Sequence, residues 1–224
     1  MERSFVRSAQ HARLAALALV SAIAIGAIAI AAVGLAPGSA RATVMVEVPL
    51  EELVRDADAI VVGVVEHVGV RLQIGDGSNV PHTITTLRVR EWIKGAGDEL
   101  VRIDEIGGVF ADGQGGMAIA GTPQYAVGDE VVVFLRRTGG VFRTYAMEQG
   151  HFTIQRGVPG VDSIVQRDLS AIGFASWSRG PMEVEHGGRA AMRVDDFLAH
   201  LRATLEQLRV HTPGGDDALG GGAR

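Results

Sequence analysis

The chain contains no cysteine and a single lysine, although it has 224 residues and 20 arginines. The missing cysteines exclude disulfide frameworks, thiolate zinc sites and cysteine nucleophiles. Any exported form must therefore be stabilised by its hydrophobic core alone, which a chain of about 180 residues can provide.

The single lysine, Lys94, stands in the stretch TLRVREWIKGAGDELVRI, which has the pattern of strand, tight turn and strand. A catalytic amine needs burial or a neighbouring cation to lower its pKa, and nothing in the sequence indicates either. The preference for arginine over lysine, with much alanine, glycine and valine, is a property of the whole composition. We therefore expect Lys94 and Gly95 to form a corner between two strands.

Sequence motifs of catalysis and metal binding are also missing. The chain has no GxxxxGK[ST] phosphate loop, no GxSxG elbow and no HExxH helix. The histidines beyond residue 42 lack the i, i+2 or i, i+4 spacing of a metal site. They are His67, His82, His151, His186, His200 and His211.

The remaining polar residues that attract attention have plain structural interpretations. His151 opens a predicted strand and is expected at the surface. Asp56 and Asp58 fit a helix end and a strand start better than a cation site, and Asp76 with Asn79 indicates a turn rather than a calcium loop. We therefore predict no catalytic residue, no cofactor and no metal. An enzyme with an unrecognised site stays open, and a cluster of Asp, Glu or His in one pocket would favour it.

The first 42 residues have the order of a targeting segment. Three arginines precede an uncharged apolar run of 22 residues, Leu14 to Leu35. Pro37 then breaks the helix, and Ala40 and Ala42 form a small-x-small cleavage pattern. This order of a basic, an apolar and a cleavable region predicts export.

The length of the apolar run leaves two outcomes open. The run exceeds the roughly 7–15 residues of a usual signal peptide and can span about 30 Å of membrane as a helix. Cleavage after Ala42 would release a secreted or periplasmic protein, whereas retention would leave an N-terminal anchor with its basic end inside. A buried core helix fits poorly, because the run has too few polar positions for a solvent-facing side. Both outcomes place the rest of the chain outside the cytoplasm.

Charge argues against one class of partner. The whole chain has 21 basic and 26 acidic residues, and the first 42 residues hold four of the former and one of the latter. The remainder therefore has 17 basic and 25 acidic residues, a net charge of −8. A nucleic-acid-binding protein needs a basic surface against phosphate, so we expect no nucleic-acid partner.

Beyond residue 42 the hydrophobic pattern predicts short strands between two helices. Pro49 followed by Glu51 and Glu52 favours the start of a helix. Gly63, inside a β-branched run, indicates a bulge or a close backbone approach, and Glu91 interrupts the alternation of the next strand. The predicted elements are a helix at 49–57, strands at 60–68, 83–93, 99–106, 130–137, 141–147, 151–156 and 163–169, a helix at 194–210, a turn at 74–82 and a Gly-rich connection at 107–129.

Several short strands with hairpin turns predict a mainly β fold, a small antiparallel barrel with a short N-terminal helix and a C-terminal helix. The predicted organisation is a signal peptide or anchor at 1–42, a β-barrel domain at 43–169, a loop rich in Gly, Ser and Arg at 170–191, a helix packing on the barrel at 192–210, and a disordered tail at 211–224.

Three short motifs carry a resemblance to a known family. They are Ala57-Asp58 before a hydrophobic strand, Ile93-Lys94-Gly95 at a strand end, and Gly128-Asp129-Glu130 before another strand. With them the chain resembles, over residues 50–155, the netrin-like and tissue-inhibitor-of-metalloproteinases module. The resemblance implies an oligonucleotide/oligosaccharide-binding (OB) type of barrel, with Lys94-Gly95 at the corner between two of its strands.

One departure from that family bears on activity. The eukaryotic inhibitors present an N-terminal cysteine, held by disulfides, to the protease zinc, and this chain has no cysteine. Cleavage after Ala42 would expose Thr43, whose amine and carbonyl offer a chelating pair without that disulfide lock. The resemblance therefore implies a binding module rather than a protease inhibitor.

We expect an exported, non-catalytic module that binds a protein partner in the cell envelope or outside the cell. Its expected contact surface is formed by loops at 69–82 and 107–128. The alternatives are a membrane-anchored envelope scaffold, with membrane contact only through residues 14–35 if they are uncleaved, a protease-inhibitor-like module, and an enzyme with an unrecognised site.

Overall fold

The computed structural model describes residues 43–75, 78–113, 115–176 and 183–211, and in them the fold is mainly β. Its helices are α2 (Leu50–Asp56) and α3 (Val194–His211), with a short 3₁₀ helix, η1 (Met147–Gly150). The strands are β1 (Thr43–Met45), β2 (Ala59–Gly75), β3 (Ser78–Lys94), β4 (Leu100–Ile106), β5 (Gly108–Val109), β6 (Gly116–Met117), β7 (Glu130–Thr138), β8 (Val141–Thr144), β9 (His151–Gln155), β10 (Ile164–Asp168), β11 (Ile172–Ser176), β12 (Glu183–His186) and β13 (Arg189–Arg193).

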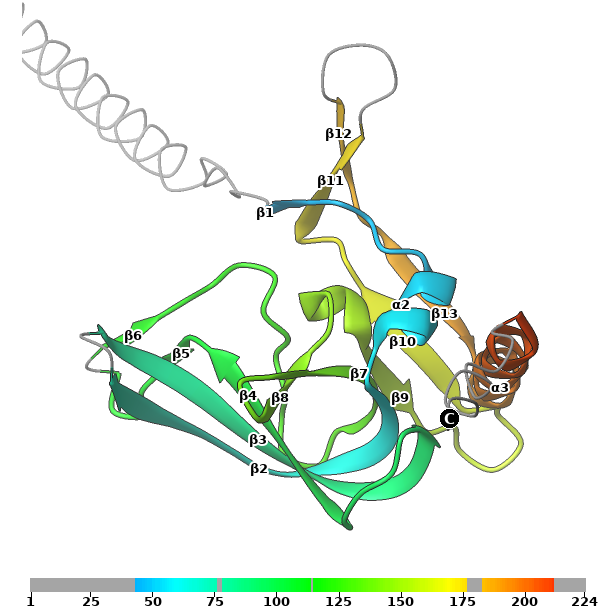
Figure 1. The fold of residues 1–224 in the computed structure, drawn as a ribbon, viewed down its shortest axis with the longest axis horizontal. Helices are drawn as coiled ribbons and strands as arrows, with labels where there is room; N and C mark the ends of the chain where they lie inside the picture. Colours follow the sequence, from blue (N-terminus) through cyan, green and yellow to red (C-terminus); the bar gives the residue numbers. More distant parts are fainter. Residues whose placement is uncertain (1–42, 76–77, 114, 177–182, 212–224) are drawn as a thin grey trace, which may run out of the picture. The chain divides into compact units, whose positions relative to one another are not determined.

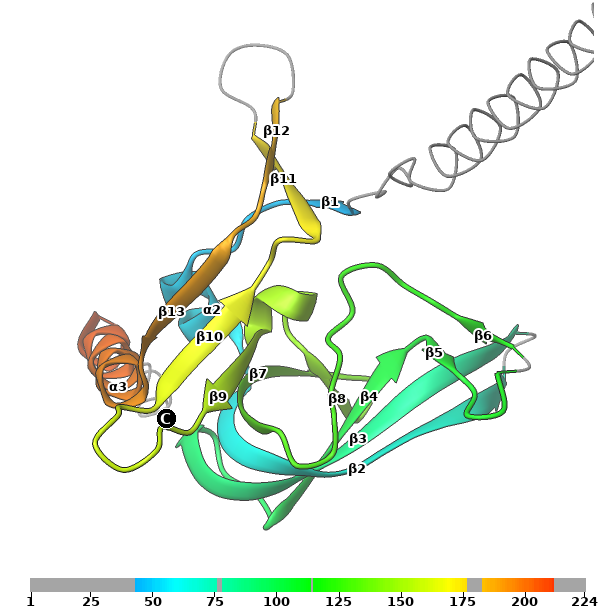
Figure 2. The ribbon, with the colours of Figure 1, turned by 180° about the vertical axis from the view of Figure 1, so that it is seen from behind.

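Eight strands form the main sheet, in the order β13-β10-β9-β7-β2-β3-β4-β8 (Figure 1, and from behind in Figure 2). Neighbours run antiparallel except β4 and β8, which meet at the parallel pair of Ile103 and Phe142. β8 also pairs with the end of β7, where Leu135 lies opposite Thr144. The pairing therefore runs from β7 through β2, β3, β4 and β8 and returns to β7.

β2 and β7 are buried on both faces, which accounts for their unbroken β-branched sequences. Alternate residues on one face, such as Ile60 and Phe134, belong to a core beneath the two helices, called the helix-side core. Residues on the other face, such as Val61 and Val133, belong to a strand-side core shared with β3 and β4. Both cores therefore depend on the same two strands.

The helix-side core confirms the apolar face predicted for the C-terminal helix. Phe197 and Leu201 of α3 are buried there, and Phe152 of β9 stacks against Phe197 with 4.8 Å between ring centroids. α2 contributes Leu53 and Val54, which are fully buried. Because α2 is only seven residues long, this tertiary packing is what holds it, since isolated helices of that length are marginal in water.

The bulges predicted in the first hairpin are confirmed. The register of β2 against β3 shifts between Val62 and Gly63, which skips Arg90 beside Glu91. At this point a Cβ on Gly63 would lie 2.8 Å from the carbonyl oxygen of Arg88. Glycine is therefore required at position 63 by the close approach of the β3 backbone.

The turn predicted at 74–82 is wrong, and the same hairpin explains why. β2 and β3 stay paired along their length, up to Gly75 opposite Ser78. In the outer part of β2 the side chains are exposed, as Leu72 and Ile74 are, so neither alternation nor burial marks these residues as strand. Cross-strand pairing with the inner half of the hairpin overrides the local turn preference of Gly, Asn and Pro.

The loop predicted at 170–191 is also wrong, because the described part of this segment contains β11, β12 and the start of β13. β12 and β13 are exposed along their whole length, so they lack the hydrophobic period by which a strand is identified. β13 pairs with β10 and β12 pairs with β11.

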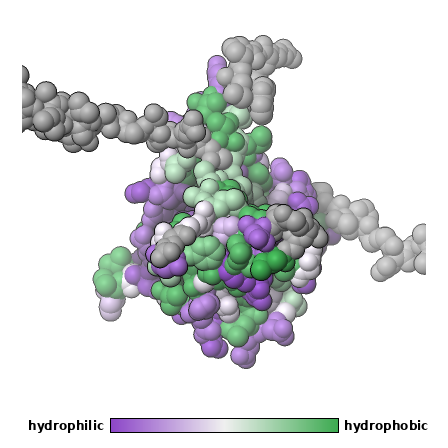
Figure 3. Space-filling view, turned by 90° about the vertical axis from the view of Figure 1, so that its left-hand side faces the viewer, coloured by the Kyte–Doolittle hydropathy of each residue, from purple (hydrophilic) through white to green (hydrophobic). Residues whose placement is uncertain are grey.

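A separate three-stranded sheet, β1-β11-β12, projects from the main sheet in Figure 1. Apolar side chains continue into it on the face shown in Figure 3, and Val44 and Val184 are among its exposed residues. Within the described residues no helix has the length and hydrophobicity needed to cross a membrane. The predicted signal or anchor, 1–42, and most of the predicted tail, 212–224, lie outside the described residues.

We expect Gly63→Ala to lower the free energy of unfolding by about 1–3 kcal/mol, because the new methyl group must displace the β3 backbone. Urea unfolding midpoints measure the change. Gly188→Ala is the matched control, since its Cβ would meet nothing within 4 Å. Equal effects of the two changes would contradict the close approach at Gly63.

Candidate binding cleft

Two adjoining hollows, each of 480 Å³, lie beside β4 and β8. They share Arg71 and Val141, so they form one continuous cleft. Its walls come from the outer part of β2, the β3–β4 corner, β4, and the β7–β8 turn. Its basic residues are Arg71, Arg102, Arg137 and Arg143, and we call it the arginine cleft.

Strand alternation brings these arginines to the cleft. On β4, Val101 and Ile103 point into the strand-side core, so Arg102 and Asp104 point to the opposite face. On β8 the side chain of Thr144 is buried, which turns the neighbouring Arg143 outward. The cleft is therefore assembled from the outward positions of strands whose inward positions build a core.

Three cleft arginines have no carboxylate partner among the described residues. Arg102 is exposed and makes no ion pair, and the guanidinium of Arg137 lies 4.4 Å from the ring centroid of Phe142. The Nε of Arg143 is buried without a hydrogen-bond partner. A donor such as this Nε is costly to bury unpaired, so an acceptor is expected beside Arg143.

Most arginines elsewhere in the described part are neutralised. Salt bridges with Asp or Glu hold Arg55, Arg88, Arg90, Arg156, Arg189, Arg193, Arg202 and Arg209. Arg136 and Arg167 are the other described arginines without such a pair. Within the described residues most arginines are therefore paired with a carboxylate, and three of the five that are not line one cleft.

Asp104 is the buried acid of the cleft. Its Oδ1 bonds to Nδ1 of His82, and its Oδ2 accepts from Nη2 of Arg71 at 3.1 Å. His82 is itself buried and does not line either hollow. The imidazole therefore holds the Asp104 carboxylate in position from the interior of the protein. The lining of the cleft still has more arginines than carboxylates, so its net charge is positive.

The neighbouring Glu105 points the other way, into the protein. Its Oε1 accepts a hydrogen bond of 2.6 Å from the backbone N–H of Thr144, whose hydroxyl contacts the Tyr125 hydroxyl at 2.7 Å. Burial raises the pKa of Glu105. This second polar group is separated from the cleft by the backbone of β4, so it is structural.

Lys94 lies at the predicted corner between β3 and β4, where Gly95 takes a φ of +80°. Its Nζ donates hydrogen bonds of 2.8 Å to the carbonyl oxygens of Val54 and Arg55. These carbonyls end α2, so the lysine caps the C-terminus of that helix, where a cation is favoured. Burial lowers the pKa of Lys94, yet its ammonium is committed to these two acceptors.

The prediction that His151 lies at the surface is wrong. The side chain is buried, with Nδ1 3.1 Å from Glu148 and the ring edge-on to Tyr125. It opens β9, and the pairing of β9 with β7 turns it inward. Asp56 pairs with Arg55, and Asp58 accepts from the backbone N–H of Arg137.

No sequence motif predicts the cleft. Its arginines lie between positions 71 and 143 on four strands, and only the pairing of those strands joins them. The contact surface expected at 69–82 overlaps the cleft at Arg71–Ile74, but as strand rather than loop. The expected surface at 107–128 contains β5 and β6 and lines a different hollow.

Comparison with known proteins assigns no family. The chain matches no family model, and no curated protein shows detectable sequence similarity to it. Within the described residues, no group of three or more His, Asp or Glu side chains is placed to hold a metal ion.

The buried carboxyl of Glu105 predicts a pH effect on stability. Its raised folded pKa means that its favourable contribution is present below its ordinary value of 4.5 and is lost as pH rises through the folded pKa. We therefore expect Glu105→Gln, which keeps the acceptor and removes the charge, to be more stable than the parent chain at pH 7. The difference should disappear toward pH 4.

Urea unfolding at a series of pH values measures this difference. Glu206→Gln, at an exposed position on α3, is the control and should show no comparable pH dependence. A parent chain more stable than Glu105→Gln at pH 7 would show that the charged form is the one the fold stabilises.

Proposed function

We propose that this protein is an exported, non-catalytic binding module whose arginine cleft receives an acidic segment of a protein partner. The observation that carries the proposal is the set of three cleft arginines without carboxylate partners among the described residues. Arginine forms paired hydrogen bonds with carboxylates, so side chains of Asp or Glu are the natural acceptors. Phe142 beneath Arg137 holds that guanidinium in place for such a contact.

The same proposal includes an OB-like barrel of the netrin-like type. The return of the strand pairing from β8 to β7 supports it, as do the Lys94-Gly95 corner and the order of the five strands β2, β3, β4, β7 and β8. Barrels of this type bind ligands on the second and third strands and on the loops that follow the first and fourth. In that numbering the arginine cleft lies against the outer part of the first strand, the third strand and the loop that follows the fourth.

Export rests on the order of charge, hydrophobicity and small residues in the first 42 positions. Cleavage after Ala42 gives a secreted or periplasmic protein. Retention of residues 14–35 gives the alternative, a membrane-anchored scaffold with the same cleft. Residue Thr43 begins β1 and pairs with Ile172 of β11, so the residue next to the expected cleavage site has a fixed partner.

The enzyme alternative has one observation in its favour, the contact of His82 with Asp104. Such a pair orients imidazoles that act as general bases. Because His82 is buried and does not line the cleft, its imidazole has no described route to a bound substrate. The binding function therefore accounts for more of the site.

Charge reversal in the cleft tests the proposal. A fluorescent peptide of twelve residues, half of them glutamate, is the probe, and fluorescence anisotropy with the full chain is the measurement. We expect Arg102→Glu combined with Arg143→Glu to weaken binding by about tenfold or more, roughly 1.4 kcal/mol. Binding to the unchanged protein should weaken as salt rises, because the contacts are solvent-exposed.

The matched control changes the same net charge elsewhere, with Arg189→Glu combined with Arg209→Glu at exposed salt bridges. Equal weakening in both double variants would mean that only net charge matters and would reject the cleft. Tighter binding of a single-stranded oligonucleotide than of the peptide would reject the protein partner.

A further inference from the structure

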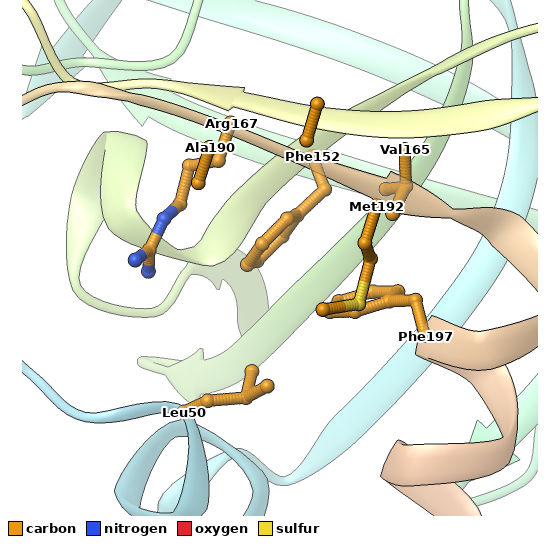
Figure 4. A pocket seen from close by; sticks show the side chains of 8 residues that line it. Leu50, Phe152, Val165, Arg167, Ala190, Met192 and Phe197 are labelled. Atoms are coloured by element: carbon orange, nitrogen blue, oxygen red, sulfur yellow. The ribbon is translucent and has the colours of Figure 1, made fainter.

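A second cavity lies between the helices α2 and α3 and the part of the main sheet formed by β9, β10 and β13. Its volume is 130 Å³ (Figure 4). Leu50 of α2 faces the sheet residues Phe152, Val165 and Met192 across it, and Phe197 of α3 packs against Phe152 at its edge. The walls are apolar, and Arg167 of β10 is the only charged residue that lines it.

The pairing of β10 with β13 arranges the sheet side of this cavity in rows. Val165 pairs with Met192, and Arg167 pairs with Ala190. Cross-strand partners share a face of the sheet, so all four side chains point toward the helices. The intervening Ala191 also lines the cavity.

Arg167 is one of the described arginines that form no salt bridge with a described carboxylate, and it is partly buried. Its guanidinium lies 5.2 Å from the ring centroid of Phe152, and its Nη1 makes only a long hydrogen bond of 3.4 Å to the backbone oxygen of Gln149. Burial lowers the pKa of this guanidinium, and the exposed Glu47 opposes that effect only from a distance. A bound carboxylate would supply the missing partner.

We propose that this cavity binds the C-terminal residue of a protein or peptide that ends in leucine or phenylalanine, with the side chain in the cavity and the terminal carboxylate on Arg167. An apolar cavity of about 150 Å³ holds one benzene-sized group. A volume of 130 Å³ therefore suits a single large apolar side chain.

The neighbouring strand edge favours a peptide over a free fatty acid. β13 ends the strand order of the main sheet, so its outer edge has no strand partner among the described residues, and all five of its residues are exposed. Such an edge offers unpaired backbone N–H and C=O groups to an extended chain. These groups lie beside the cavity, which β13 itself lines through Ala190 and Met192.

The probe is a fluorescent hexapeptide that ends in leucine with a free carboxylate. Three competitors are the same peptide with a C-terminal amide, the same peptide ending in aspartate, and octanoate. Binding is followed by fluorescence anisotropy with the full chain. We expect saturable binding of the free acid and at least tenfold weaker competition by the amide and by the aspartate peptide.

Two substitutions test the two halves of the site. Arg167→Gln should weaken binding of the free acid at least tenfold and should leave the amide unchanged. Ala190→Leu should abolish binding by filling the cavity. The matched controls, Arg209→Gln and Ala203→Leu at exposed positions of α3 outside the cavity, should bind as the unchanged protein does.

The outcomes separate the proposal from its rivals. No saturable binding, or equal binding of the acid and the amide, would overturn it. Octanoate competing more strongly than the leucine peptide would overturn the peptide in favour of a free amphiphile. The acidic probe of the arginine cleft, bound normally by Arg167→Gln, shows that this variant is folded, so a loss at the cavity belongs to the cavity.

Discussion

The fold depends on two strands that are buried on both faces. Val61 and Val62 of β2 are adjacent in sequence, yet one faces the strand-side core and the other faces the helix-side core. β7 repeats this arrangement with Val132 and Val133. Neither core can form without these strands, because β2 and β7 contribute side chains to both cores. The helices, the long hairpin and the outer strands are then placed by which face of this central pair they cover.

This dependence explains how far the sequence predicts the structure. The β-branched run at 60–68 and the apolar stripe of α3 report burial directly, so both elements are predicted correctly. Every residue of β12 and β13 is exposed, so no burial pattern in their sequence indicates the pairing that makes them strands. The prediction of a surface position for His151 is wrong for the same reason, because the burial of this side chain follows from the pairing of β9 with β7. The local sequence pattern predicts an element when burial of its side chains produces that pattern. It misses an element that forms only through pairing with residues far away in the sequence.

The candidate sites could not be predicted for a related reason. Arg102 and Arg143 are outward neighbours of core residues, 41 positions apart in sequence, and nothing local connects them. Lys94 shows the converse, since its single occurrence attracts attention that its position does not justify. Its ammonium ends α2 through two backbone carbonyls, so the residue links the hairpin to the helix and takes part in neither cavity. That a residue type is rare in the sequence therefore says little about whether it binds a ligand. A charged side chain without an ion-pair partner in the structure is a better indication of a binding site.

The distribution of ion pairs carries the functional argument furthest. This chain has more acidic than basic residues, so carboxylates are plentiful enough to pair every arginine. Arg90 and Arg156 even share one acid, Glu130, within the described part. Against that background, Arg143 at the arginine cleft and Arg167 at the apolar cavity are each partly buried and form no salt bridge with a described carboxylate. Burying a guanidinium without a carboxylate partner lowers the stability of the folded protein. At these two positions no salt bridge with a described carboxylate offsets that loss. A carboxylate from a bound partner would offset this loss. The two cavities differ in the carboxylate they suit: side chains along an acidic segment in the arginine cleft, and a chain terminus with one apolar side chain in the apolar cavity.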